Sequence, residues 1–216
     1  LPLWTAVKAA VGRGASTQPT EEMRELGLHL STRLTMLPRI YRRINEGSRA
    51  IRSSVASRQP HHESAPGREG YAFDLDDDLK FSFLLDLDSL LFELNSVCEL
   101  ITHLFELSYS HAGRPLPTVP AGRAIKSVLE AAGHDTDWFR DLDTNRNFFS
   151  HVGAPYFAVD LSSPTGQDLL IMKKNLRTFE DETAFLRLSA LEAMALGFEK
   201  ARHVIKDHLI TLFAAL

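Results

Sequence analysis

Three residues with chemically capable side chains lie close together late in the chain: Arg146, Asn147 and His151, within the sequence RNFFSH. At about 100° per residue, an α-helix through this segment places Arg146 on the same face as the apolar Leu142 and Phe149. A guanidinium keeps its proton, and burying it without a partner costs free energy. An arginine on an apolar face therefore marks either a functional site or a structural charge that has a partner.

This set of side chains suits the cleavage of a phosphodiester. Arginine binds phosphate oxygens through its planar fork and stabilises charge that builds on phosphorus. Histidine, with a reference pKa of about 6.5, can accept or donate a proton near neutral pH. Cleavage of RNA through its own 2′-OH needs only these two functions, so we expect no metal and no cofactor. The products would end in a 2′,3′-cyclic phosphate and a 5′-hydroxyl.

The two proton transfers of this reaction favour a homodimer. His151 is a single imidazole and does one transfer at a time, and it diverges from Arg146 by about 140° around the helix. A two-fold interface formed by the segment around 138–152 and a long helix at 79–109 would bring two arginines and two histidines into one cleft. We therefore expect two copies of the chain to form each site.

The order of these residues resembles a known family. An arginine, a polar residue, a few further residues and then a histidine, late in a helical chain, are similar to the HEPN superfamily, with Arg146, Asn147 and His151 in the three places. The resemblance implies a dimeric helical bundle and a metal-independent endoribonuclease, with Arg146 and His151 catalytic and Asn147 supporting them. It also implies a toxin or phage-defence effector that an antitoxin or regulatory protein restrains.

Two other interpretations stay open. The chain could be a catalytically inert HEPN-like scaffold, or it could be an unrelated helical interaction protein. In the last case Arg146 would pair with an acid such as Asp143, and His151 would only cap its helix.

A basic stretch precedes an acidic one. Residues 33–58 carry seven arginines and one acid, whereas residues 74–99 carry eight acids and one lysine. On a helix the arginines cover about half the circumference, which would suit an RNA backbone. The alternative is a solvated face or a contact with the acidic stretch. The proposed RNA-binding residues are Arg39, Arg42, Arg43, Arg49 and Arg52.

Apolar spacing predicts an all-α fold, an up-and-down bundle of about five helices with a small β-hairpin between the last two. Residues 1–19 are expected to be a flexible segment, and 20–216 a single helical-bundle domain with a mobile loop at about 59–73. Thr20 should cap the first long helix, in which Pro38 either makes a kink or starts a second helix. The remaining elements are expected at 79–109, 121–132, 136–151, 156–159 paired with 169–172, and 181–213.

Composition excludes several classes. Hydrophobic residues make up 44% and charged residues 24% of the 216 residues, as in ordinary globular proteins. One cysteine cannot form a disulfide framework. The net charge of −4 gives no global attraction to nucleic acid or anionic lipid. No apolar run approaches membrane-spanning length and no signal peptide is recognisable, so we expect a cytoplasmic protein with no membrane partner.

Overall fold

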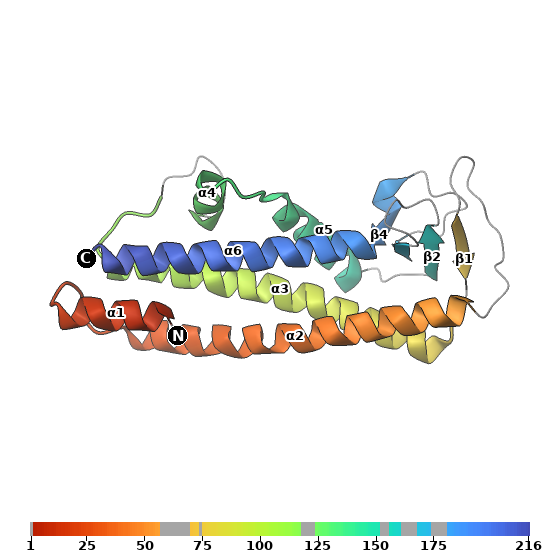
Figure 1. The fold of residues 1–216 in the computed structure, drawn as a ribbon, viewed down its shortest axis with the longest axis horizontal. Coiled ribbons are helices and arrows are strands. Elements are labelled where there is room, and N and C mark those ends of the chain that lie inside the picture. The colour runs from red at the N-terminus through yellow and green to blue at the C-terminus, as the bar shows by residue number, and fades with distance from the viewer. Residues whose placement is uncertain are drawn as a thin grey trace. The chain divides into compact units, whose positions relative to one another are not determined.

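The chain is mostly α-helical with one small antiparallel sheet, which confirms the predicted fold class. A computed structural model describes residues 2–56, 70–73, 75–117, 124–151, 156–160, 168–173 and 181–216. Figure 1 shows the helices of these ranges: α1 (Pro2–Gly12), α2 (Glu21–Ala56), α3 (Asp77–His111), α4 (Ala124–Ala131), α5 (Asp137–His151) and α6 (Leu188–Ala214).

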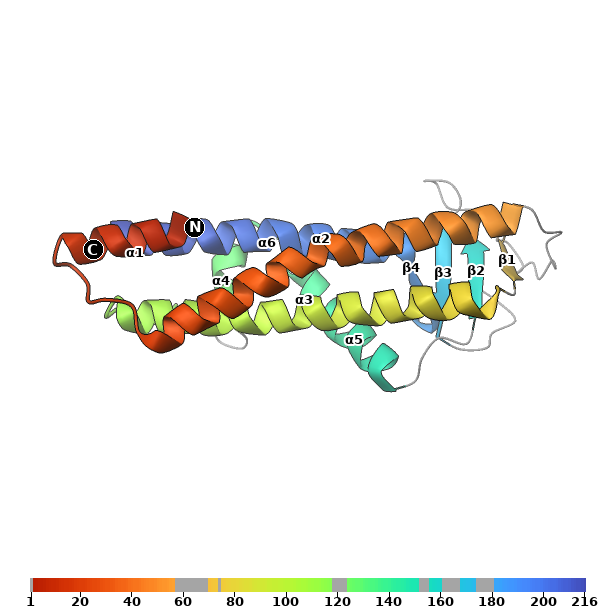
Figure 2. The same ribbon diagram turned by 90° about the horizontal axis from the view of Figure 1, so that it is seen from below.

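The sheet has the strand order β1-β2-β3-β4, and each neighbouring pair is antiparallel. The strands are β1 (Gly70–Phe73), β2 (Tyr156–Asp160), β3 (Asp168–Met172) and β4 (Phe185–Arg187), and Figure 2 shows them side by side. Strands β2 and β3 form the predicted hairpin, with Tyr156 opposite Met172 and Asp160 opposite Asp168. Strands β1 and β4 extend this hairpin on its two sides.

Side-chain caps begin three of the helices. The Met23 amide donates to Thr20 Oγ1 over 3.2 Å at the start of α2, which confirms the predicted cap. The Asp78 amide donates to Asp76 Oδ1 over 3.1 Å, and the Asp137 amide donates to Asp135 Oδ1 over 2.9 Å. These carboxylates also lie at the positive end of the helix dipole. Helix α2 continues through Pro38 as one element.

Three segments differ from what the sequence predicts. Residues 2–12 form α1 instead of a flexible segment, because Val7 and Ala10 are buried in a cluster that includes Phe213. The end of the predicted 59–73 loop is strand β1, since its backbone pairs with β2; residues 57–69 lie outside the described ranges. The last helix begins at Leu188, because residues 182–184 form a short 3-10 helix and residues 185–187 pair with β3.

The chain forms two compact units where the sequence predicts one domain. Unit 1 consists of Leu1–Met36, Leu94–Arg140 and Leu196–Leu216, and unit 2 consists of Leu37–Glu93 and Asp141–Ala195. Helices α2, α3, α5 and α6 therefore contribute residues to both units.

The core of unit 2 joins α2, α3 and the sheet through Phe83. Its ring meets that of Phe157 on β2 edge to face, with centroids 5.6 Å apart. Gly47 on α2 makes room for this ring, because a Cβ there would lie 2.8 Å from Phe83 Cδ2. The register places Phe157, Ile171 and Leu186 on one sheet face, and all three are buried. The helical part of unit 2 thus holds the hairpin from which β1 and β4 extend.

Unit 1 contains α1 and a half-buried histidine, His208. Figure 2 shows α1 lying alongside the C-terminal part of α6, where Val7, Ala10 and Phe213 pack together. Nearby on α3, Tyr109 Oη lies 2.5 Å from His208 Nε2 of α6, and the two rings stack. Burial lowers the pKa of His208 and raises the pKa of Tyr109. The pair therefore favours a neutral imidazole and a neutral phenol.

The His208 environment predicts a loss of stability in mild acid. The folded-state pKa of His208 lies below the unfolded value of about 6.5, so the unfolded chain takes up the proton first as the pH falls. The contribution of His208 to the free energy of unfolding should be constant above this pH and decrease below it. Urea unfolding of wild type and His208→Gln between about pH 7.5 and 5.5 isolates that contribution from the other histidines. Parallel pH profiles for the two proteins would contradict the prediction.

Candidate active site

The candidate site is built on α5, and the structure places Arg146 at the edge of the buried face of that helix. Leu142, one turn earlier, has 1% of its surface exposed, and Phe149, three residues later, is half-buried. Arg146 itself is half-buried, and its Nε atom is shielded from solvent. The position expected from helical geometry is therefore the position observed.

The Nε atom of Arg146 lacks a hydrogen-bond partner among the described residues. This Nε atom is buried, and no ion pair joins the guanidinium to Asp143 in the part of the chain that the structure describes. Asp143, three residues before Arg146 on α5, is exposed. The alternative in which Asp143 neutralises Arg146 is therefore not observed. A buried donor without a partner costs free energy and calls for a functional explanation.

The other two residues of the predicted site lie on the same helix. Asn147 follows Arg146 and is exposed, so its amide is open to a ligand. His151 is the last residue of α5, but its side chain lies outside what the structure describes. The helix thus fixes the backbone spacing of Arg146, Asn147 and His151, and their side-chain geometry as a trio is not part of the structure.

Sequence reasoning missed two polar groups beside this site. Asn145 is 6% exposed; its Nδ2 donates to the Asp141 carbonyl over 2.8 Å, while its buried Oδ1 has no partner among the described residues. Asn145 is seven residues after the buried Trp138, so the same helical geometry could have found it. Lys173 follows β3, and its Nζ lies 5.5 Å from the centroid of the Phe148 ring on α5. No sequence pattern indicates that contact, because it depends on how the hairpin packs.

The ammonium group of Lys173 has a pKa below its ordinary value. Burial lowers this pKa, and the Asp141 carboxylate opposes the change. Asp141 and Phe148 are seven residues apart and share a face of α5. Position 151, three residues after Phe148, lies on the neighbouring face. Lys173 therefore adds a cation to the side of α5 away from Arg146.

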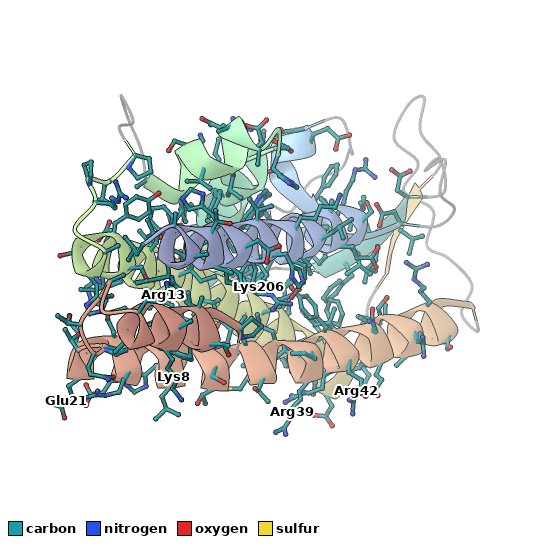
Figure 3. All side chains as sticks on the ribbon, turned by 60° about the vertical axis from the view of Figure 1, so that its left-hand side comes forward. Lys8, Arg13, Glu21, Arg39, Arg42 and Lys206 are labelled. Carbon is teal, nitrogen blue, oxygen red and sulfur yellow. The ribbon has the colours of Figure 1, made fainter. Side chains whose placement is uncertain are left out.

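The proposed RNA-binding arginines divide into two kinds. All five side chains are exposed, and Figure 3 shows Arg39 and Arg42 extending from α2 into solvent. Arg43 forms an ion pair of 2.6 Å with Asp86, a carboxylate of the acidic stretch that is 11% exposed. The expected contact between the basic and acidic stretches thus exists for Arg43. Among the described residues, no hydrogen bond or ion pair engages Arg39, Arg42, Arg49 or Arg52.

Arg187 is a partly buried arginine with a structural role, and it is paired with carboxylates. On β4 it contacts Asp160 Oδ2 at 2.7 Å, Asp168 Oδ2 at 3.8 Å and Glu182 Oε1 at 3.1 Å. Asp160 and Asp168 are 7% and 5% exposed, and hydrogen bonds to Glu182 and Asp160 raise the pKa of Arg187 despite its partial burial. This cluster closes the end of the hairpin at β4. Arg187 thus has three carboxylate partners, whereas Arg146 Nε has no partner in the described ranges.

Comparisons with protein-family models, curated proteins and solved structures each find no match for this chain. Among the described residues, no helix has the length and apolar character to cross a membrane. Nor do three or more histidine, cysteine, aspartate or glutamate side chains gather in those ranges as metal ligands would.

The two arginines predict opposite effects on stability. Arg146→Met removes a buried donor that has no partner, so the free energy of unfolding should stay unchanged or rise by up to about 1 kcal/mol. Arg187→Met leaves Asp160 and Asp168 buried without their cation, so the free energy of unfolding should fall by about 3 kcal/mol. Urea unfolding of both variants at neutral pH measures the difference. A loss for Arg146→Met as large as that for Arg187→Met would show that Arg146 is structural.

Proposed function

We propose that this chain is a metal-independent endoribonuclease of HEPN type that acts as a toxin or phage-defence effector. The observation that carries the proposal is the half-buried Arg146, whose Nε has no hydrogen-bond partner among the described residues, on the helix that ends at His151. An arginine kept in this state is suited to an anion that arrives from outside, and a phosphate is the anion its fork fits best. The helical fold and the exposed Asn147 are consistent with this proposal.

The chemistry requires one charge stabiliser and two proton transfers. A neutral His151 takes the proton of the RNA 2′-OH as the 2′-oxygen attacks phosphorus. A protonated His151 of the second copy gives a proton to the 5′-oxygen as the P–O5′ bond breaks. Arg146 stabilises the negative charge that builds on the phosphoryl oxygens. The products are a 2′,3′-cyclic phosphate and a free 5′-hydroxyl, and atoms balance without a further reactant.

Substrate binding in this proposal uses the exposed arginines of α2. Arg39, Arg42, Arg49 and Arg52 offer guanidinium groups to successive phosphates, whereas Arg43 is held by Asp86. The proposal also requires a homodimer, because each site needs two imidazoles. Restraint by an antitoxin or regulatory protein would explain how a cell tolerates such an activity.

The site residues predict graded losses of activity. In an RNA cleavage assay with EDTA present, His151→Ala should lower the rate by about 10²-fold or more, since general acid–base help is lost. Arg146→Lys should also be strongly impaired, because an ammonium lacks the planar fork, whereas Asn147→Ala should lose less. His29→Ala and Arg140→Ala, exposed positions on α2 and α5, serve as controls and should keep full activity.

The outcomes of that assay separate the proposals. Products that carry a 3′-hydroxyl, or cleavage that needs added divalent metal, would contradict the mechanism. Absence of cleavage together with binding of RNA would favour the inert scaffold. A strictly monomeric protein in light scattering, with no cleavage, would favour an unrelated helical interaction protein.

The arginines of α2 predict a change in salt dependence. Replacing Arg39, Arg42, Arg49 and Arg52 by alanine should weaken single-stranded RNA binding for all sequences and flatten the log–log salt slope by about 3, at roughly 0.7 per lost phosphate contact. Arg43→Ala is the matched control and should change the slope by less than a single exposed variant, because Asp86 already holds that guanidinium. Fluorescence anisotropy at several salt concentrations measures the slopes. An unchanged slope in the fourfold variant would assign these residues to a solvated face.

A further inference from the structure

A cavity of about 310 Å³ opens within unit 1, between α1, α2, α3 and α6. This volume lies at the lower end of the range of about 300–1,000 Å³ for small-ligand pockets. Protein interiors otherwise contain few voids larger than a water molecule. A space of this size, lined by residues of one compact unit, is therefore a candidate binding site.

The walls of the cavity are mainly apolar and are held in place. Leu30 and Leu34 of α2 and Leu209 of α6 line it, together with the Trp4 ring. That ring is seated on Gly27, where a Cβ would lie 2.6 Å from Trp4 Cζ2. Helix α1 is itself anchored by the buried cluster around Phe213. The cavity is thus pre-formed, which lowers the cost of binding a ligand.

The charged residues that line the cavity are both cations. Arg202 and Lys206 lie one turn apart on α6, with side chains 31% and 37% exposed, so they reach both the cavity and solvent. Glu199 accepts hydrogen bonds from Nε and Nη2 of Arg202, and Nη1 has no hydrogen-bond partner among the described residues. Lys206 Nζ lies 3.2 Å from Asp207 Oδ1, which leaves donors on the ammonium. Figure 3 shows Lys206 reaching from α6 toward α1.

We propose that this cavity binds a free amphiphile with an apolar chain and an anionic head, of the long-chain carboxylate class. The chain would lie against Leu30, Leu34 and Trp4, and the carboxylate would accept hydrogen bonds from Arg202 and Lys206. A purely apolar ligand would leave the two cations unused, and a small polar anion would leave the apolar walls exposed to water. Helix α1 already walls the cavity on one side, and the cavity volume of about 310 Å³ is in the range for a small ligand.

The test is calorimetric titration of the full chain with sodium dodecanoate below its micelle-forming concentration. Dodecan-1-ol and dodecyltrimethylammonium carry the same chain with a neutral and a cationic head. Wild type should bind dodecanoate most tightly. The double variant Arg202→Gln/Lys206→Gln should bind dodecanoate at least about tenfold more weakly and dodecanol unchanged, as expected for lost charge-assisted hydrogen bonds. Lys200→Gln, exposed on α6 and outside the cavity, is the matched control and should bind like wild type.

A second variant tests the location. Thr35 lines the cavity at an exposed position, so Thr35→Trp should block entry while leaving the core intact, and dodecanoate binding should be lost. Equal affinity for the three head groups, no binding by wild type, or undiminished binding by Thr35→Trp would each overturn the proposal. Phosphatidylglycerol vesicles separate a membrane surface from a free ligand: vesicle binding without dodecanoate binding would also overturn it. None of these measurements involves RNA, so the outcome is independent of the proposed nuclease activity.

Discussion

The rest of the structure depends on covering the apolar stripe of α3. Leu87, Leu90, Leu91, Leu94 and Val97 are fully buried, so other elements must remove this face from water along most of the helix. In unit 2 the covering begins at Phe83, between Gly47 of α2 and Phe157 of the sheet. In unit 1, Phe105 and Tyr109 stack against His208 of α6.

The cavity of unit 1 lies beside the same stripe of α3. Ile101 and Leu104 of the stripe line this cavity. The same apolar stripe of α3 thus contributes both to the core and to the wall of the candidate ligand site.

Buried polar groups have partners at the sheet, whereas several of those on α5 have none among the described residues. Arg187 has carboxylates on three sides, and Ser189 donates from its backbone N–H and its hydroxyl to Asp168. On α5, by contrast, Asn145 Oδ1 and Arg146 Nε are buried on successive residues without a partner in the described chain. A buried polar group without a partner lowers the free energy of unfolding, so the unsatisfied groups of α5 do not stabilise the fold. If Arg146 binds a phosphate as we propose, its unsatisfied Nε is the cost in stability of that function, and the stability of Arg146→Met measures that cost.

The sequence predicts those features that depend on local spacing. Helices α2 and α3, the Thr20 cap and the β2–β3 hairpin follow from periodicity and turn residues, and so does the place of Arg146 on its helix. Strand β4 could not be recognised, because Phe185 lies three residues before Leu188 and so continues the apolar spacing of the last helix. Residues 185–187 form a strand only because they pair with β3. Helix α1 was missed because Val7 and Ala10 are small residues whose burial is supplied by distant segments. The contact of Lys173 with Phe148 is of the same tertiary kind.

Net charge is a poor guide to what this surface can bind. The basic stretch of α2 and the acidic stretch of α3 would cancel if every charge were paired, and the chain as a whole carries −4. Yet Arg43 is the member of the arginine set that Asp86 engages, whereas Arg39, Arg42, Arg49 and Arg52 remain exposed. Exposed charges more than about 8 Å apart are largely screened at physiological ionic strength. The potential that an approaching phosphate meets is therefore set by the local group of guanidinium side chains on α2, and an acidic protein can still present a surface that binds an anionic polymer.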